Sequence, residues 1–392
     1  MVRIYPRRKH FGIHQIQSII SGMKKLFLLC SLISVLLSFA SASELQAARI
    51  AASLDDNALA AQVLMTGIDG RQALSSSARA SLERIPAGGI MLFRYNLDSN
   101  RDDIKRLLSE TANLVAGRTG IPPLMAVDHE GGLVHRFGTV VERLPSAYSF
   151  WEMAQRQGRD AALAHAETLY LRSALEIREL GITMVLAPVV EILDEENVAF
   201  LASRSYGPDS DFVQAAASVF VRSMDAAGIA CVLKHFPGNS AADPHYAFST
   251  LNAPKQVLDE MVLPFAGIIS SLQPSAVMLS HAVVPAVESG RNASLSRHVI
   301  ESWLRRELGF QGIALSDDYA MDAVAATGLS PAAAAVQALN SGIDMIMVWP
   351  GNIAAVHTAI LQALSNGQLS RERLEQAASR IIAEKIRYRL IN

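Results

Sequence analysis

Apolar residues occur along the chain in short continuous runs that alternate with longer stretches of helical periodicity. Eight such runs follow the first 50 residues. Each is continuous rather than alternating, as is typical of parallel strands buried on both faces. We therefore predict strands at residues 63–66, 89–93, 124–127, 184–187, 230–233, 276–279, 313–315 and 345–348.

Helical periodicity fills the intervals between these runs. Apolar residues recur at helical spacing over residues 161–180, and the segment 370–388 forms an amphipathic helix after the turn Asn366-Gly367. A closed (β/α)₈ barrel requires eight strands that alternate with helices, and this is the number that the pattern predicts. We predict an α/β protein with a single (β/α)8 TIM-type barrel. A doubly wound open sheet is the rival fold, but no G-x-G-x-x-G or phosphate-binding loop follows any strand.

The first 42 residues have the pattern of a secretory signal peptide rather than of the barrel. Lys24-Lys25 precede an apolar run over 26–39, and Ala40-Ser41-Ala42 is a small-residue cleavage pattern. We predict a signal peptide over 1–42, with Met23 as the true start, and one domain over 43–392. The protein is then exported to the periplasm or the extracellular space, without a stable membrane partner after cleavage. An uncleaved N-terminal anchor is the alternative.

Charge and cysteine content exclude several classes of function. The net charge of the 392-residue chain is −2, and no basic patch stands out, so nucleic acid is not an expected partner. Cys30 lies in the predicted signal and Cys231 in a predicted strand. We therefore expect neither an internal disulfide nor a cysteine-based metal site.

Polar side chains gather where the predicted strands end, which is where such barrels place their catalytic groups. Each residue has a structural explanation of its own, such as a turn, a helix cap, a surface ion pair or a core histidine. Their coincidence at one rim instead favours acid/base chemistry on a polyhydroxylated substrate. These residues are Asp128, Glu130, His135, Arg136, Arg204, Lys234, His235, Asp243, His245, His281, Asp317, Asp318 and Trp349.

A metal site is a second interpretation of some of these residues. Asp243, His245, His235 and His281 are chemically suitable ligands. No H-E-x-x-H or comparable spacing is present, however, so we expect no metal and no other cofactor.

Four motifs in this order carry a resemblance to a known family. They are "VDHEGG…HRF", "LAPVVEI…SRSYG", "KHFPG…D-x-H" and "LSDD…M". Together they resemble glycoside hydrolase family 3, and more narrowly its single-domain β-N-acetylhexosaminidase branch. The resemblance covers roughly residues 55–388.

The resemblance implies a role for each matching residue. Asp317, the first Asp of S-D-D, corresponds to the nucleophile. His245 corresponds to the acid/base, with Asp243 as its orienting partner. The residues implied in holding the sugar hydroxyls and the N-acetyl group are Asp128, Arg136, Arg204, Lys234 and His235. The implied substrates are β-linked GlcNAc-containing saccharides, such as muropeptide-like fragments, and we expect a monomer.

This assignment is chemically coherent. Retaining hydrolysis needs a carboxylate to trap the oxocarbenium-like carbon and an acid to protonate the leaving oxygen. A histidine, whose ordinary pKa is about 6.5, can lose and regain a proton near neutral pH. An aspartate two residues earlier can fix its tautomer, as in hydrolase triads.

The loop that carries this pair departs from the family pattern, which reads K-H-F-P-G-H-G-x-x-x-x-D-S-H. Asn239 and Ser240 replace His and Gly, the segment before Asp243 is two residues shorter, and Pro244 replaces Ser. Glu191 also stands where the family often has Asp. Two alternatives therefore stay open: a glycoside phosphorylase of the same family, and a non-catalytic barrel that binds sugar.

Overall fold

The computed structural model describes residues 42–241 and 249–391. The chain divides into two compact units after Gln46, and the unit Ala47–Asn392 contains all the labelled strands and helices. The proposed signal peptide, apart from Ala42, and Cys30 lie outside the described residues, as do Asp243, Pro244 and His245. Within the described ranges, no helix is both long and apolar enough to cross a bilayer.

The central element is a barrel of parallel strands, as the sequence predicts. The strands follow one another around the barrel in chain order, and β1 pairs with β12. A bridge between Leu315 and Met345 closes the ring. The eight strands of this sheet are β1 (Leu64–Gly67), β2 (Gly89–Leu92), β3 (Leu124–Val127), β6 (Met184–Val185), β7 (Ala230–Phe236), β8 (Ala276–Leu279), β11 (Ile313–Ser316) and β12 (Ile346–Val348).

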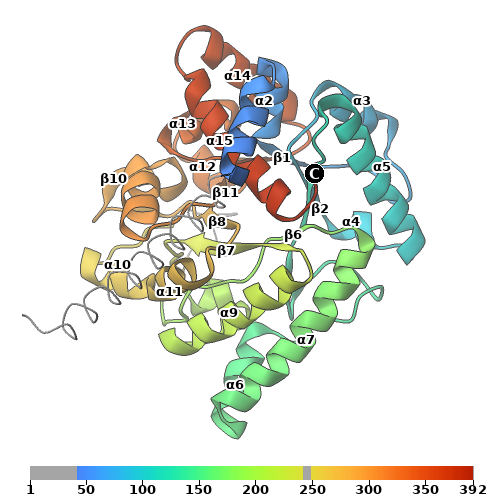
Figure 1. The fold of residues 1–392 in the computed structure, drawn as a ribbon. Helices are drawn as coiled ribbons and strands as arrows, with labels where there is room; N and C mark the ends of the chain where they lie inside the picture. Colours follow the sequence, from blue (N-terminus) through green and yellow to red (C-terminus); the bar gives the residue numbers. More distant parts are fainter. Residues whose placement is uncertain (1–41, 242–248, 392) are drawn as a thin grey trace, which may run out of the picture. The chain divides into compact units, whose positions relative to one another are not determined.

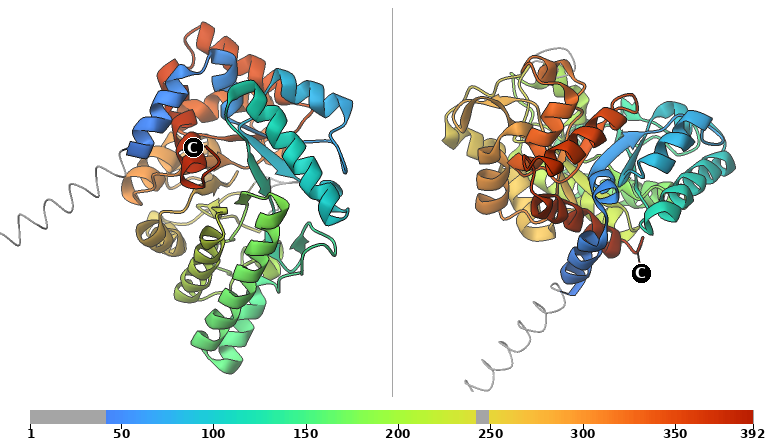
Figure 2. Two further views of the ribbon diagram at one scale, coloured as in Figure 1. Left: turned by 45° about the vertical axis from the view of Figure 1, so that its right-hand side comes forward. Right: turned by 90° about the horizontal axis from the view of Figure 1, so that it is seen from above.

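Helices lie around the outside of these strands (Figures 1 and 2). The predicted helix at 161–180 is confirmed as α7, and the predicted C-terminal helix as α15, whose N-cap Ser370 accepts a hydrogen bond from the N–H of Arg373. The helical segments are α2 (Asp56–Gln62), α3 (Ser76–Arg84), α4 (Arg94–Leu97), α5 (Arg101–Thr119), α6 (Ala147–Gln157), α7 (Arg159–Leu180), α8 (Val198–Leu201), η1 (Ala202–Arg204), α9 (Ser210–Ala226), α10 (Lys255–Met261), α11 (Leu263–Leu272), η2 (Ala293–Leu295), η3 (His298–Glu307), α12 (Asp322–Ala325), α13 (Pro331–Ser341), α14 (Ile353–Ser365) and α15 (Arg371–Arg387).

Two short hairpins interrupt the alternation of strand and helix. The strands β4 (His129–Gly131) and β5 (Val134–His135) follow β3, and β9 (Val283–Val284) and β10 (Glu288–Asn292) follow β8. Both pairs are antiparallel. The first hairpin matters for function, because it extends from the end of β3 and carries charged residues over the mouth of the barrel.

The strand that leads into the loop with Asp243 and His245 is longer than predicted. The strand β7 continues to Phe236, which pairs with Leu279 of β8, whereas the apolar run ends at Leu233. Lys234 and His235 are therefore strand residues, and both are buried. Cys231 lies in the same strand as a buried free thiol, and its burial raises the pKa well above the ordinary value.

Candidate active site

A cavity of about 550 Å³ opens at the end of the barrel to which the strands point. Methionine and leucine side chains in or just beyond four barrel strands form much of its apolar part. The ends of the strands and the segments beyond them supply its charged part. The lining residues are Met91, Asp128, Glu130, Val134, Arg136, Leu186, Arg204, Lys234, His235, Met278, Asp317, Asp318, Ala320, Met321, Met347 and Trp349.

Six of the eight residues predicted for the site line this single cavity: Asp128, Arg136, Arg204, Lys234, His235 and Asp317. They come from regions as far apart in the chain as β3 and β11. The other two, Asp243 and His245, lie outside the described residues. Their predicted roles as orienting partner and acid/base therefore stay predictions.

The centre of one cavity wall is an ion network around Lys234. Its Nζ lies 3.0 Å from Asp128 Oδ1 and 2.7 Å from Glu130 Oε1. Arg204 binds Glu130 in a two-pronged arrangement, with Nε 2.8 Å from Oε2 and Nη2 2.9 Å from Oε1. Arg136 Nη2 lies 3.2 Å from Asp128 Oδ2. Bidentate arginine–carboxylate geometry of this kind fixes both partners in orientation.

The charges of this network reinforce one another. Burial alone would raise the pKa of the Asp128 and Glu130 carboxyls, but the ammonium of Lys234 and the neighbouring guanidiniums lower both pKa values below the ordinary range. Burial would lower the pKa of Lys234, but the two carboxylates raise it above its ordinary value. All members therefore remain charged near neutral pH, and the wall presents fixed donors and acceptors before a ligand arrives.

A second buried pair positions His235. Its Nδ1–H donates to Glu191 Oε1 at 2.6 Å, and its backbone N–H donates to the same oxygen at 3.2 Å. Asn239 Nδ2 donates to both oxygens of Glu191, at 3.3 and 3.2 Å. The carboxylate thereby fixes the tautomer and leaves Nε2 of His235 for contact with a ligand.

Asp317 lies directly beyond β11, half-buried, in the lining of the same cavity. Its Oδ1 accepts a hydrogen bond of 2.8 Å from the N–H of Asp318. Among the described residues, no lysine, arginine or histidine lies within ion-pair distance of its carboxylate, in contrast to Asp128 and Glu130. A carboxylate that has no cationic partner in this part of the chain is suited to attack an electron-deficient carbon.

The neighbours of Asp317 have structural roles. Asp318 Oδ1 accepts from the N–H of Ala320 at 2.9 Å and so stabilises the turn. His281 is fully buried; its Nδ1 lies 2.8 Å from Ser294 Oγ and its Nε2 lies 3.0 Å from the carbonyl oxygen of Asp318. Of the two interpretations of His281, a core histidine or a metal ligand, the structure therefore favours the hydrogen-bonded core residue. Over residues 42–241 and 249–391, no group of three or more His, Cys, Asp or Glu is arranged to hold a metal ion.

Two important residues had no role assigned from the sequence, although Glu130 was counted among the polar residues at the strand ends. Glu130 links Lys234 to Arg204, and Glu191 holds His235. Glu130 follows Asp128 by two positions, a spacing that places side chains on the same face of an extended segment. That alternation was the signal that could have assigned it to the site.

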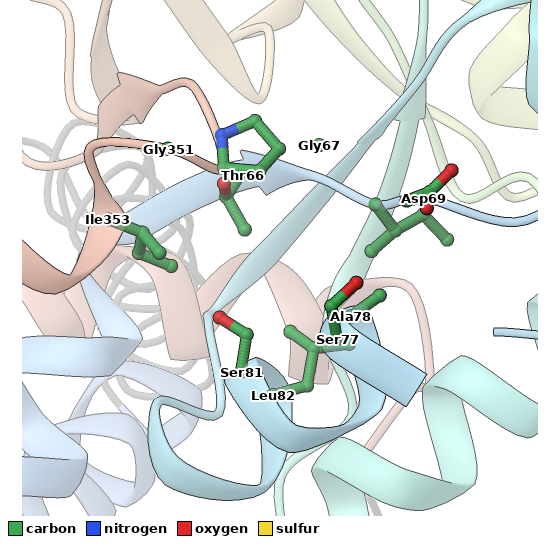
Figure 3. A pocket seen from close by; sticks show the side chains of 11 residues that line it. Thr66, Gly67, Asp69, Ser77, Ala78, Ser81, Leu82, Gly351 and Ile353 are labelled. Atoms are coloured by element: carbon green, nitrogen blue, oxygen red, sulfur yellow. The ribbon is translucent and has the colours of Figure 1, made fainter. Parts of the chain in front are cut away.

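A smaller cavity of about 280 Å³ lies between the end of β1, helix α3 and the start of α14 (Figure 3). Its polar lining includes Thr66, Asp69, Ser77 and Ser81. None of the residues predicted for the site lines this cavity. The candidate catalytic and sugar-binding residues are concentrated in the cavity of about 550 Å³.

Comparison with known proteins agrees with this arrangement. Residues 54–383 match the family model described as the glycosyl hydrolase family 3 N terminal domain. The chain belongs to this family. It is therefore a glycoside hydrolase by family, and the resemblance seen in the four motifs is confirmed.

Several family 3 relatives are similar over most of the domain. A protein of Methylococcus capsulatus named beta-hexosaminidase is 34% identical over 299 residues, which cover 75% of this chain and 84% of the relative. A protein of Chromobacterium violaceum with the same name is 34% identical over 320 residues, which cover 80% of this chain and 85% of the relative.

Solved structures give the same fold. A glycoside hydrolase family 3 beta-N-acetylglucosaminidase from a Paenibacillus strain superposes with a TM-score of 0.80 at 31% identity. The match covers 86% of this chain but only 63% of that chain, less than two thirds of its length. NagZ from Neisseria gonorrhoeae, solved in complex with N-trifluoroacetyl-D-glucosamine, gives a TM-score of 0.68 at 26% identity, covering 82% of this chain and 97% of that one.

Proposed function

We propose that this chain is a retaining β-N-acetylhexosaminidase that removes terminal β-linked N-acetylglucosamine from peptidoglycan fragments or related glycans. The observation that carries the proposal is that the Asp317 carboxylate, which has no cationic partner among the described residues, lies in one cavity with a rigid wall of charged donors and acceptors. The names of the relatives, beta-hexosaminidase and beta-N-acetylglucosaminidase, support the choice of sugar.

The wall suits a neutral sugar held by its hydroxyl groups. Lys234, Arg136 and Arg204 supply donors, whereas Asp128 and Glu130 supply acceptors, and none of these five groups has to change its protonation state. With Asp317 and Asp318 included, the cavity lining holds three cations and four carboxylates. Charge-assisted hydrogen bonds from such groups orient a hydroxylated ring without requiring a charged ligand.

In the proposed mechanism the Asp317 carboxylate attacks the anomeric carbon as the glycosidic oxygen takes a proton from His245. A water molecule, deprotonated by His245, then releases the sugar from Asp317. Asp243 orients His245. These roles of Asp243 and His245 rest on the family motif and on the chemistry of the pair.

Hydrolysis of 4-nitrophenyl N-acetyl-β-glucosaminide tests the proposal. We expect turnover that falls by on the order of 10³-fold or more in Asp317→Asn and in His245→Ala, and we expect the first product detected by NMR to be the β-anomer. No turnover would indicate a barrel that only binds sugar. A sugar 1-phosphate as main product in phosphate buffer would indicate a phosphorylase, and activity unaffected by His245→Ala would remove that residue as the acid/base.

Export and monomeric state are part of the proposal. The basic, apolar and small-residue segments over 23–42 support an exported protein. The N-terminal sequence of the protein recovered from the periplasm or medium should begin near residue 43, and its mass in solution should be that of one chain. A product that keeps residues 23–42 in the membrane fraction would indicate an anchor.

A further inference from the structure

The β4–β5 hairpin has two faces, and only one of them lines the active-site cavity. Glu130 and Val134 line the cavity, whereas their strand neighbours His129 and His135 do not and are only 0% and 6% exposed. The alternation of side chains along a strand explains this division. His129 and His135 lie opposite one another in the register of the two strands. We call these two residues the histidine pair.

The histidine pair packs the hairpin against its surroundings. Nε2 of His129 lies 2.7 Å from Oγ of Ser173, a buried residue of α7. The buried ring of Phe137 meets the His129 ring in a T-shaped contact, with centroids 5.2 Å apart and an interplanar angle of 87°. Nε2 of His135 donates to the carbonyl of Gly138 at 3.0 Å. The pair therefore joins the hairpin to α7 and to the segment that follows it.

The surroundings of the pair suit neutral imidazoles. Because Nε2 of His135 donates to a carbonyl oxygen, its Nδ1 holds a lone pair when the ring is neutral. Among the described residues, Nδ1 of neither histidine has a hydrogen-bond partner, and no carboxylate lies within ion-pair distance of either ring. Protonation would thus create a buried cation with an N–H group that has no acceptor.

The charges around the pair act in the same direction. Burial, and then the neighbouring His135, lower the pKa of His129 from 6.5 to about 3. Burial also lowers the pKa of His135, against the hydrogen bond to the Gly138 carbonyl, which raises it. The cations that lower it further are Arg143, Arg94 and Arg136. Since both pKa values are lowered in the closed hairpin, the stability that the neutral pair gives is present above pH 6.5 and is lost as the pH falls toward 3.

We propose that His129 and His135 are positioning residues, which hold the hairpin against α7 while they are neutral and release it when they are protonated in acid. Release would move Glu130 away from Lys234 and Arg204, so the wall of the cavity would lose its geometry and bind a sugar more weakly. The inference goes beyond the proposed function but rests on it, because the wall is the proposed sugar-binding surface.

Hydrogen–deuterium exchange of the peptide 129–138 measures the opening of the hairpin without requiring activity. An imidazole that returns to its ordinary pKa on opening changes the ratio of open to closed hairpin about 25-fold between pH 7 and pH 5. After correction for the intrinsic exchange rate at each pH, exchange in the parent should rise by about tenfold or more. His165→Gln, a change at an exposed histidine of α7, should keep this rise.

Variants of the pair separate protonation from packing. The double variant His129→Gln/His135→Gln keeps amide groups that can bond to Ser173 and Gly138 but cannot be protonated, so its corrected exchange should change by about twofold or less over the same pH range. His129→Ala removes the contact with Ser173, and its hairpin should exchange faster than that of the parent even at pH 7. Thermal melting controls for folding.

Calorimetric titration with N-acetylglucosamine links the hairpin to the cavity. This ligand is neutral at both pH values, so a change in Kd arises in the protein. The Kd of the parent should rise by about tenfold from pH 7 to pH 5, because only the closed hairpin presents the wall. In the double glutamine variant, which keeps every other titratable group of the cavity, the rise should be about threefold or less.

Three results would overturn the inference. Hairpin exchange in the parent that does not change with pH would mean that the hairpin stays closed. An equal rise of exchange in the parent and in the double glutamine variant would mean that other groups open it. An equal rise of Kd in both proteins would remove the link to sugar binding. Failure of the proposed function would look different, because no aryl glycoside would be cleaved while hairpin exchange still changed with pH.

Discussion

Two networks of buried carboxylates and cations lie at opposite ends of this barrel. At the carboxyl ends of the strands, Glu130 and Asp128 bind Lys234 and two arginines. At the amino ends, Asp344, which precedes β12, binds Arg305, Arg373 and Arg380. The ion-pair chemistry is the same at both ends, yet only one network faces a cavity among those described.

The difference lies in how completely each carboxylate is satisfied by the protein. Asp344 has no exposed surface, and its two oxygens accept bonds from three guanidiniums and from the N–H of Ala314 at 2.9 Å. At the other end, the side chain of Arg136 is 31% exposed and that of Arg204 is 20% exposed. A network whose hydrogen-bonding groups are all satisfied within the protein can only hold elements of the fold together. A network whose donors are partly exposed can also bind a ligand.

The largest effect should come from breaking the network at Asp344. Replacement by Ala leaves Arg305, which is buried, without its carboxylate, and should lower the free energy of unfolding by about 3–5 kcal/mol. Denaturant unfolding measures this change. Glu179→Gln is the matched control, because Glu179 also pairs with two cations but is exposed, and its midpoint should stay close to that of the parent. Equal stability of both variants would contradict a structural role for Asp344.

The second effect concerns the functional network. Glu130→Gln keeps the shape of the side chain but removes the charge between Lys234 and Arg204, and should lower kcat/KM on the aryl glycoside by about 100-fold, or ~2.7 kcal/mol. Its effect on unfolding should be smaller than that of Asp344→Ala, because water in the cavity can solvate the two cations.

The control for this variant is Glu142→Gln, an exposed carboxylate paired with Arg172. If Glu130→Gln kept the kcat/KM of the parent but lost much of its stability, the network at Glu130 would be structural, like that at Asp344, and the proposed difference between them would be wrong.

The two networks also differ in how far the sequence predicts them. Asp128, Arg136, Arg204 and Lys234 were predicted because each stands just beyond an apolar run or within a family motif. Asp344 was not, because its three partners lie 29 to 39 positions away on η3 and α15, where nothing in the local pattern indicates contact. Long-range pairing of charges becomes visible only once the helices are packed.

The same distinction holds for the fold. The eight barrel strands were predicted to within a few residues, because parallel strands buried on both faces are continuous apolar runs. The β4–β5 hairpin was not predicted, since Val134 is the only apolar residue of its two strands. Its pairing depends on the turn at Gly131 and Gly132, which have φ of 91° and 53°. For that reason Glu130 was recognised only as a polar residue after a strand and was given no role in the site.

A third, smaller effect should appear at acid pH. Burial alone would raise the pKa of Asp344, but three guanidiniums lower it below its ordinary value of 3.8. A lowered folded-state pKa means that the charged form contributes stability above about pH 5, and that this contribution is lost as the pH falls through 4. The stability gap between the parent and Asp344→Asn should therefore narrow by about 1 kcal/mol between pH 6 and pH 3.

Unfolding by urea at several pH values measures that gap. The pKa values of Asp128 and Glu130 are also lowered, so these carboxyls change stability with pH in the same direction. Because both residues are present in the parent and in Asp344→Asn, their contributions cancel when the two unfolding free energies are subtracted. A gap that is constant with pH would mean that the Asp344 carboxylate gains nothing from its arginines.

A fourth effect, similar in size to the third, should come from Glu191. This residue shares features of both networks, because it is buried like Asp344 but holds His235, a cavity residue. Glu191→Leu removes the acceptor for His235 Nδ1 and should raise KM on the aryl glycoside by about tenfold, or ~1.4 kcal/mol. Glu191→Gln keeps an acceptor oxygen and should raise it by only about threefold. A merely structural residue would instead lower stability in both variants and leave KM unchanged, so the graded change in KM is the result that assigns Glu191 to the site.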